Sequence, residues 1–100
     1  LEGGKYSEEI ASDSNGYVVS INNKSLVKVA RAAGAPVRKG AGILLEKKMG
    51  MKVDRGEIIY TIFSDSKTRL EEAVKLSNRL KPVAVEGMVL ERVVPSGRIL

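Results

Sequence analysis

Glycines next to cations are the first feature of this chain that could take part in chemistry. Gly40-Ala41-Gly42 follows Arg38 and Lys39, and glycine-rich backbone beside cations forms anion-binding nests. The segment has neither a Walker pattern nor a Gly-x-Gly-x-x-Gly pattern. We therefore favour the alternative, a loop that enters a strand and carries two solvated cations.

Paired carboxylates could act as general acid and base. Glu8-Glu9 and Glu71-Glu72 are sequence neighbours, and such neighbours do not share a helix face. The chain has no His and no Cys, so the usual nucleophile–base pairs and transition-metal ligands are missing. We expect surface carboxylates, and no catalytic, substrate-binding, cofactor-binding or metal-binding residue in this chain. The isolated glutamates are Glu46, Glu57, Glu86 and Glu91.

Lys67 could be a modified lysine. In biotinyl and lipoyl carrier domains, a Gly-x-x-Val-x-x-Gly turn and a strand precede a hairpin that presents such a lysine, and Gly50–Gly56 has this spacing. However, Ser66 and Thr68 stand where carriers have Met or Ala, and a helical pattern begins there instead of a second strand. A carrier domain is therefore the least favoured alternative.

Length and composition predict one small domain. The chain has 100 residues, of which 43% are hydrophobic, enough for a single core. It has no apolar run of transmembrane length and no signal-peptide h-region. The lack of Cys favours a cytoplasmic location. The many Lys, Arg and Glu suggest a thermophile, and because the chain lacks a starting Met we expect it to be part of a longer protein.

The net charge of +5 invites a nucleic-acid interpretation. The basic residues are scattered, though, and no Phe or Tyr alternates with Lys47-Lys48 to stack bases. We expect a solvated surface and keep a free-standing, basic RNA-binding module as the alternative function.

Two helices are predicted. Asn22-Asn23 offers an N-cap, and apolar residues at helical spacing continue to Gly34, which predicts a helix over 23–33. Ser64-Asp65-Ser66 caps a second helix that Lys81-Pro82 ends. The apolar residues of the two helices are Leu26, Val29, Ala30, Ala33, Leu70, Ala73, Val74 and Leu80.

The remaining segments are predicted to be extended. Asn15-Gly16 between β-prone runs predicts a type I′ hairpin joining strands near 8–12 and 17–21. The next strand starts at 43–45 and runs out through 46–48. Residues 58–63 are apolar on both faces and predict a central strand. The last expected strands are 83–86 and 88–94, with Gly87 as a bend between them and a turn at 95–97.

These elements predict an α+β fold, a small and mostly antiparallel barrel-like sheet of the barrel-sandwich or hammerhead type with two packed helices. In the turn over 50–56, Gly50 and Gly56 supply positive φ and Val53 points into the core. We expect residues 1–7 to be a linker from a preceding domain, 8–94 to be the domain, and 95–100 to be a tail.

Several segments, in this order and spacing, resemble the C-terminal domain of the thymidine/pyrimidine nucleoside phosphorylase family. The glycine run at 40–42 favours the archaeal branch, the AMP phosphorylases, since bacterial members tend to have an acidic Asp-x-Ile-Asp run there. The segments that carry the resemblance are Asn15-Gly16-Tyr17-Val18, Ala32-Ala33-Gly34-Ala35, Lys39-Gly40-Ala41-Gly42-Ile43, Gly50-x-x-Val53-x-x-Gly56-Glu57-x-Ile59 and Val85–Arg92.

The resemblance implies an intact enzyme that splits AMP or thymidine with inorganic phosphate, giving a free base and a phosphorylated sugar. It also implies that phosphate and nucleoside or nucleoside monophosphate bind elsewhere, because the family's site motifs lie in preceding domains. The implied partners of this fragment are those domains and other copies in a homo-oligomer, with no membrane and no cofactor. The implied role is non-catalytic and supports domain closure and assembly.

Overall fold

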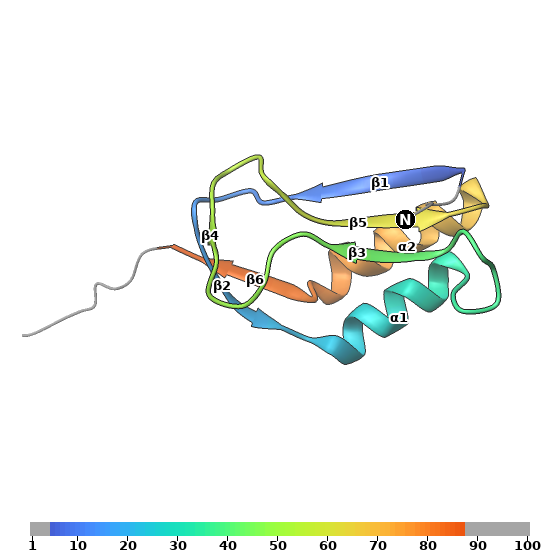
Figure 1. Cartoon of the computed structure of the whole chain (residues 1–100), viewed down its shortest axis with the longest axis horizontal. Coiled ribbons are helices and arrows are strands. Elements are labelled where there is room, and N and C mark those ends of the chain that lie inside the picture. The colour runs from blue at the N-terminus through green and yellow to red at the C-terminus, as the bar shows by residue number, and fades with distance from the viewer. Residues whose placement is uncertain (1–4, 88–100) are drawn as a thin grey trace, which may run out of the picture.

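The computed structural model describes residues 5–87 as an α+β fold with two three-stranded antiparallel sheets and two helices. One sheet has the order β1-β5-β3 and the other β4-β2-β6. In Figure 1, β2, β4 and β6 gather at one end of the molecule, and the helices lie side by side along the other sheet. The elements are β1 (Tyr6–Ala11), β2 (Gly16–Ile21), α1 (Asn23–Ala33), β3 (Gly42–Leu45), β4 (Lys52–Val53), β5 (Ile58–Ser64), α2 (Lys67–Leu80) and β6 (Val83–Glu86).

β5 is the central strand of its sheet, as its apolar sequence predicts. It pairs with β1 on one edge and β3 on the other, and both helices contact it. Ile62 is fully buried, and its neighbours Tyr60 and Thr61 are nearly so although they point to opposite faces. Burial on both faces explains why β-branched and aromatic residues run through this strand without polar alternation.

The two helices have the capping chemistry that their sequences predict. The Asn22 side chain accepts a hydrogen bond from the Ser25 N–H at 3.0 Å, and Ser66 does the same for Arg69 at 3.3 Å. Gly34 ends α1 at φ 122°, where its N–H donates to the carbonyls of the last turn. The core faces of the helices pack on each other and on β5, and their buried residues are Val29, Ala33, Leu70, Ala73 and Ser77.

The turn over residues 50–56 has the predicted structure. Gly50 and Gly56 have φ angles of 85° and 90°, in a region that residues with a Cβ atom rarely adopt. Val53 between them is completely buried, and Lys52 and Asp54 are exposed. Backbone pairing with β2 and the buried Val53 side chain together hold β4 in place.

The predicted Asn15-Gly16 hairpin is wrong. β1 pairs with β5 and β2 pairs with β4 and β6, so the segment around Asn15 joins two different sheets. Neither residue has a positive φ, which a type I′ turn requires. The Asn15 side chain accepts a hydrogen bond from the Arg55 N–H at 2.7 Å. The glycine is needed for a different reason: a Cβ at position 16 would overlap with the backbone of Glu86.

The predicted fold class is confirmed, but the two sheets are not closed into a barrel. β1 begins at Tyr6, two residues before the expected start of the domain, and β3 ends at Leu45 instead of running out through 46–48. β6 ends at Glu86, just before Gly87. The strand expected over 88–94 and the turn at 95–97 lie outside the described residues.

Replacing Gly16 by Ala tests the contact between β2 and β6. The added methyl would force the Glu86 backbone away, so we expect the free energy of unfolding to fall by roughly 1–3 kcal/mol, the range for overpacking. Ser20→Ala, at an exposed position of the same strand, is the control and should change stability little. Urea denaturation measures both, and an unchanged midpoint for Gly16→Ala would contradict the close approach.

Candidate functional site: a groove between the two sheets

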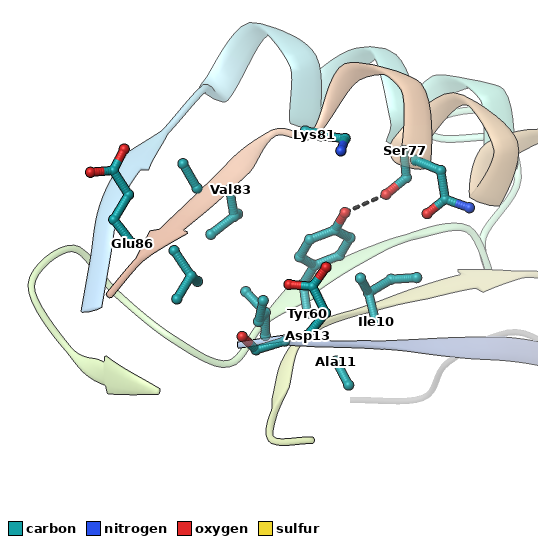
Figure 2. Close-up of a pocket in the computed structure, with 13 residues that line it drawn as sticks. Ile10, Ala11, Asp13, Tyr60, Ser77, Lys81, Val83 and Glu86 are labelled. Atoms are coloured by element: carbon teal, nitrogen blue, oxygen red, sulfur yellow. Dashed lines mark hydrogen bonds between the residues drawn. The ribbon is translucent and has the colours of Figure 1, made fainter. Parts of the chain in front are cut away.

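A groove of about 520 Å³ lies where the two sheets meet the end of α2. β1 and β5 contribute one wall, and all four residues of β6 line the other. Figure 2 shows Tyr60 of β5 reaching across the space toward Ser77 of α2. The groove is therefore built from segments that are far apart in the sequence.

The Tyr60 hydroxyl and the Ser77 hydroxyl form a hydrogen bond at the inner end of the groove. Both residues are buried, with 3% and 2% of their surfaces exposed. Burial raises the pKa of the Tyr60 phenol above its ordinary value of 10.0, and the hydrogen bond with Ser77 opposes this change. Tyr60 is thus held neutral and its polar atom is already partnered, which suits a structural hydroxyl better than a reacting one.

Charged side chains stand along the same groove. Asp13 and Glu86 bring carboxylates, and Lys81 brings an ammonium group at the end of α2. Lys81 has φ 47°, a left-handed conformation that turns the chain from α2 into β6, and its N–H donates to the Ser77 carbonyl at 2.9 Å. Within residues 5–87, no group of three His, Cys, Asp or Glu side chains could hold a metal ion.

The free edge of β6 adds backbone groups to the groove. β6 pairs with β2, and no other strand in the described part of the chain pairs with its second edge. Unpaired edges present N–H and C=O groups that can bind another extended segment. The groove can therefore bind through hydrogen bonds and apolar contact with Val83 and Val85, and nothing in its geometry activates a nucleophile.

Part of the glycine-rich loop is committed to contacts of its own. The Arg38 N–H donates to the Gly34 carbonyl and the Ala41 N–H donates to the Arg38 carbonyl, so these donors are used within the loop. The Arg38 guanidinium forms an ion pair with Asp65 at 3.3 Å. The loop instead holds the end of α1 next to the start of α2.

Lys67 is the first residue of α2, directly after its N-cap Ser66. A carrier domain would present this lysine at the tip of a hairpin, so the structure lacks the context that the carrier alternative requires. The helical pattern after Ser66 is confirmed.

Three of the glutamates within residues 5–87 have a defined setting, and Glu91 lies outside the described residues. Glu8 and Glu9 are adjacent on a strand and so point to opposite faces. Glu57 accepts a hydrogen bond from the Asp54 N–H at 2.8 Å, which holds its pKa below the ordinary value, and Lys47 lies 3.5 Å away. A lowered pKa means that this stabilisation of the turn is present at neutral pH and is lost as the pH falls through the folded-state pKa.

Sequence reasoning missed the groove, although one signal was available. Ser77 lies at helical spacing from Leu70, Ala73 and Val74 on the buried face of α2. A serine at a core position needs a hydrogen-bond partner, and Tyr60 in the apolar strand β5 carries a phenol that can supply one. The partner's identity still depended on how α2 crosses that strand.

The fold and the groove define the class, a small two-sheet α+β domain that offers surfaces for binding. The chain belongs to the pyrimidine nucleoside phosphorylase C-terminal domain family, whose match covers residues 17–82. No helix within residues 5–87 has the length and apolar character needed to cross a membrane.

Sequence identity to known proteins supports the same family. The chain is 54% identical to the AMP phosphorylase of Methanococcus vannielii and 48% identical to that of Methanocaldococcus jannaschii, in each case over 93 residues, or 93% of the chain. It is 47% identical to the AMP phosphorylase of Methanospirillum hungatei over 90 residues. It spans only 17–18% of the length of these curated relatives.

The Tyr60–Ser77 pair predicts a measurable coupling. Tyr60→Phe or Ser77→Ala alone leaves one buried hydroxyl without its partner, so each should lower the free energy of unfolding by about 1–3 kcal/mol. The double variant should lose less than the sum of the two, because it leaves no orphaned hydroxyl. Strictly additive losses in urea denaturation would contradict the hydrogen bond.

The same variants predict a pH dependence. Because the folded-state pKa of Tyr60 is raised, its contribution to stability is present below pH 10 and is lost as the pH rises beyond that value. Tyr60→Phe should therefore be less sensitive than the parent sequence to unfolding at alkaline pH. Tyr17→Phe, at an exposed position, is the control and should behave like the parent.

Proposed function

We propose that this chain is the non-catalytic C-terminal domain of an archaeal AMP phosphorylase. The observation that carries the proposal is about 50% identity, over nearly the whole chain, to proteins of that name from methanogenic archaea. The intact enzyme would cleave AMP with inorganic phosphate, releasing adenine and ribose 1,5-bisphosphate. A phosphorylase acting on thymidine or another nucleoside is the alternative within the same family.

The groups described within residues 5–87 support a non-catalytic role in phosphorolysis. The reaction requires donors for the attacking phosphate, contacts to the base and an acid for the leaving nitrogen. In the groove, the buried hydroxyls of Tyr60 and Ser77 bind each other. Among residues 5–87, the glycine-rich loop has committed its Arg38 and two of its N–H donors internally. We therefore place phosphate and nucleotide in the preceding domains.

The role we assign to the domain is mechanical: it supports closure of the enzyme over its substrates and assembly into a homo-oligomer in the cytoplasm. A folded core, the groove and the edge of β6 that pairs with no strand among residues 5–87 supply surfaces for such contacts. Burial of surfaces between domains and subunits can then stabilise the closed and assembled states.

An activity measurement tests this division of labour. The intact enzyme should release adenine from AMP only when phosphate is present, and the isolated 100-residue chain should release none. A matched pair sharpens the test: Asp13→Asn in the groove of the intact enzyme should leave kcat unchanged, as should Asp54→Asn on the turn. Adenine release by the isolated chain would contradict the proposal.

An RNA-binding module is the competing function, and the net charge of +5 is its support. A binding module would keep measurable affinity for RNA at physiological salt, with a steep loss as salt is raised. Scattered exposed cations on α1, α2 and the turn instead offer no continuous basic track among residues 5–87. RNA binding by the isolated chain at 150 mM salt, about the physiological ionic strength, would favour the module.

A further inference from the structure

The exposed face of α1 carries three cations beside one apolar side chain. Lys24, Lys28 and Arg31 lie at helical spacings of four and three residues, so they project on one side within about 10 Å along the axis. Val27 lies between them, and 49% of its surface is exposed. The opposite side of α1 carries Val29 and is buried in the core. We call the set Lys24, Val27, Lys28 and Arg31 the α1 face.

The α1 face has no neutralising partner in the described part of the chain. None of its three cations forms an ion pair there, and α1 contains no carboxylate at all. α2 is different: Glu71 and Glu72 alternate with Lys75 and Arg79 on its exposed side. A solvated helix usually carries such compensating pairs. The uncompensated charge of α1 is therefore a local feature of this helix and does not follow from the overall composition.

A shallow hollow of about 340 Å³ lies on the α1 face, lined by its four residues and Asn23. The hydrocarbon stems of lysine and arginine can form apolar walls while their charged ends stay in solvent. The hollow therefore fits an apolar side chain that contacts Val27, with acidic groups beside it that reach the surrounding cations.

We propose that the α1 face docks against an acidic surface elsewhere in the parent polypeptide, a surface that places carboxylates on Lys24, Lys28 and Arg31 and an apolar side chain on Val27. This inference rests on the proposed function, in which the chain is one domain of a larger enzyme. The relatives are more than five times as long as the matched region, since it covers only 18% of them. A surface on the same polypeptide is also favoured by its high effective concentration.

A nucleic acid is a poorer match for this surface. Affinity for a nucleic acid comes largely from the phosphates that lysine and arginine side chains neutralise, and the α1 face offers only three cations. It also includes the exposed Val27, from which a phosphate backbone would gain nothing by apolar contact. An acidic protein surface uses both the charges and the valine.

Zero-length carbodiimide cross-linking of the intact enzyme tests the proposal, because it joins a lysine only to a carboxylate in direct contact. We expect cross-links from Lys24 or Lys28 to Asp or Glu residues of the same polypeptide outside this domain, identified by mass spectrometry. Their yield should fall as salt is raised, since exposed ion pairs are screened. Mixing isotopically labelled and unlabelled enzyme separates links within one polypeptide from links between subunits.

A matched pair of variants gives the control. Arg31 and Arg79 are the basic residues in the last turns of α1 and α2, and both are exposed. Arg31→Glu keeps both lysines of the α1 face but reverses a neighbouring charge, so the yield of their cross-links should fall about threefold, as expected for one partly exposed ion pair. Arg79→Glu should leave the yield unchanged, and thermal melting of both variants would reveal any loss of folding.

The outcomes separate this proposal from the function on which it rests. If the enzyme cleaves AMP but its α1 lysines form no cross-links, or form them only between subunits, the docking proposal is overturned and the function stands. Equal loss of cross-links in both variants would also overturn it. So would an absence of cross-links that nuclease treatment reverses, because a nucleic acid would then cover the lysines. Specific cross-links in an enzyme that does not cleave AMP would support docking and reject the proposed activity.

Discussion

Ile62 of β5 is enclosed between Glu8 of β1 and Ile43 of β3, its register partners, while α1 and α2 contact the strand that carries it. It has no exposed surface, and the rest of the structure depends on this burial. β5 orders both of its neighbouring strands through hydrogen bonds and gives the two helices a common apolar floor. Fully burying such a side chain contributes about 1.5–3 kcal/mol, which is large beside the net stability of a small domain.

The second sheet is held to the first through the ends of the same elements. β2 runs directly into α1, and α2 runs through Lys81 into β6. Ser12 exchanges backbone hydrogen bonds with Gly56 and Glu57, which ties the crossing between β1 and β2 to the glycine turn. Because these connections are short, they leave the second sheet little freedom relative to the first. The groove between the sheets therefore follows from how β5 packs. Its lining is polar where the chain changes direction and apolar where β6 faces it.

Features of the fold could be predicted from the sequence where the residues that cause them are close together in the chain. The caps at Asn22, Gly34 and Ser66 act within a few residues, and the predicted helices agree with the structure. The Gly50–Gly56 turn was predicted for the same reason. Gly16 shows where local sequence patterns fail. The pattern drew attention to this glycine, but the reason a glycine is needed there is the close approach of the Glu86 backbone, 70 residues later. Pairing of β1 with β5 and contact of Ser77 with Tyr60 are also non-local: the position of Ser77 on the buried face of α2 indicated that it needs a partner, but did not identify Tyr60.

On the proposed function, this domain carries surfaces for protein contacts and the substrate chemistry takes place in the preceding domains. The groove, the edge of β6 and the α1 face are suited to protein contacts, whereas the candidate phosphate loop is occupied by its own hydrogen bonds and the Arg38–Asp65 ion pair. On the proposed function, the domain acts on the reaction by helping to position the parts that perform it.

Calorimetric titration of the isolated 100-residue chain with AMP and with inorganic phosphate tests this claim most directly. The account predicts no heat beyond dilution for either compound up to millimolar concentration. Saturable binding of AMP or phosphate to the isolated chain would contradict it, because a substrate site would then lie within this domain.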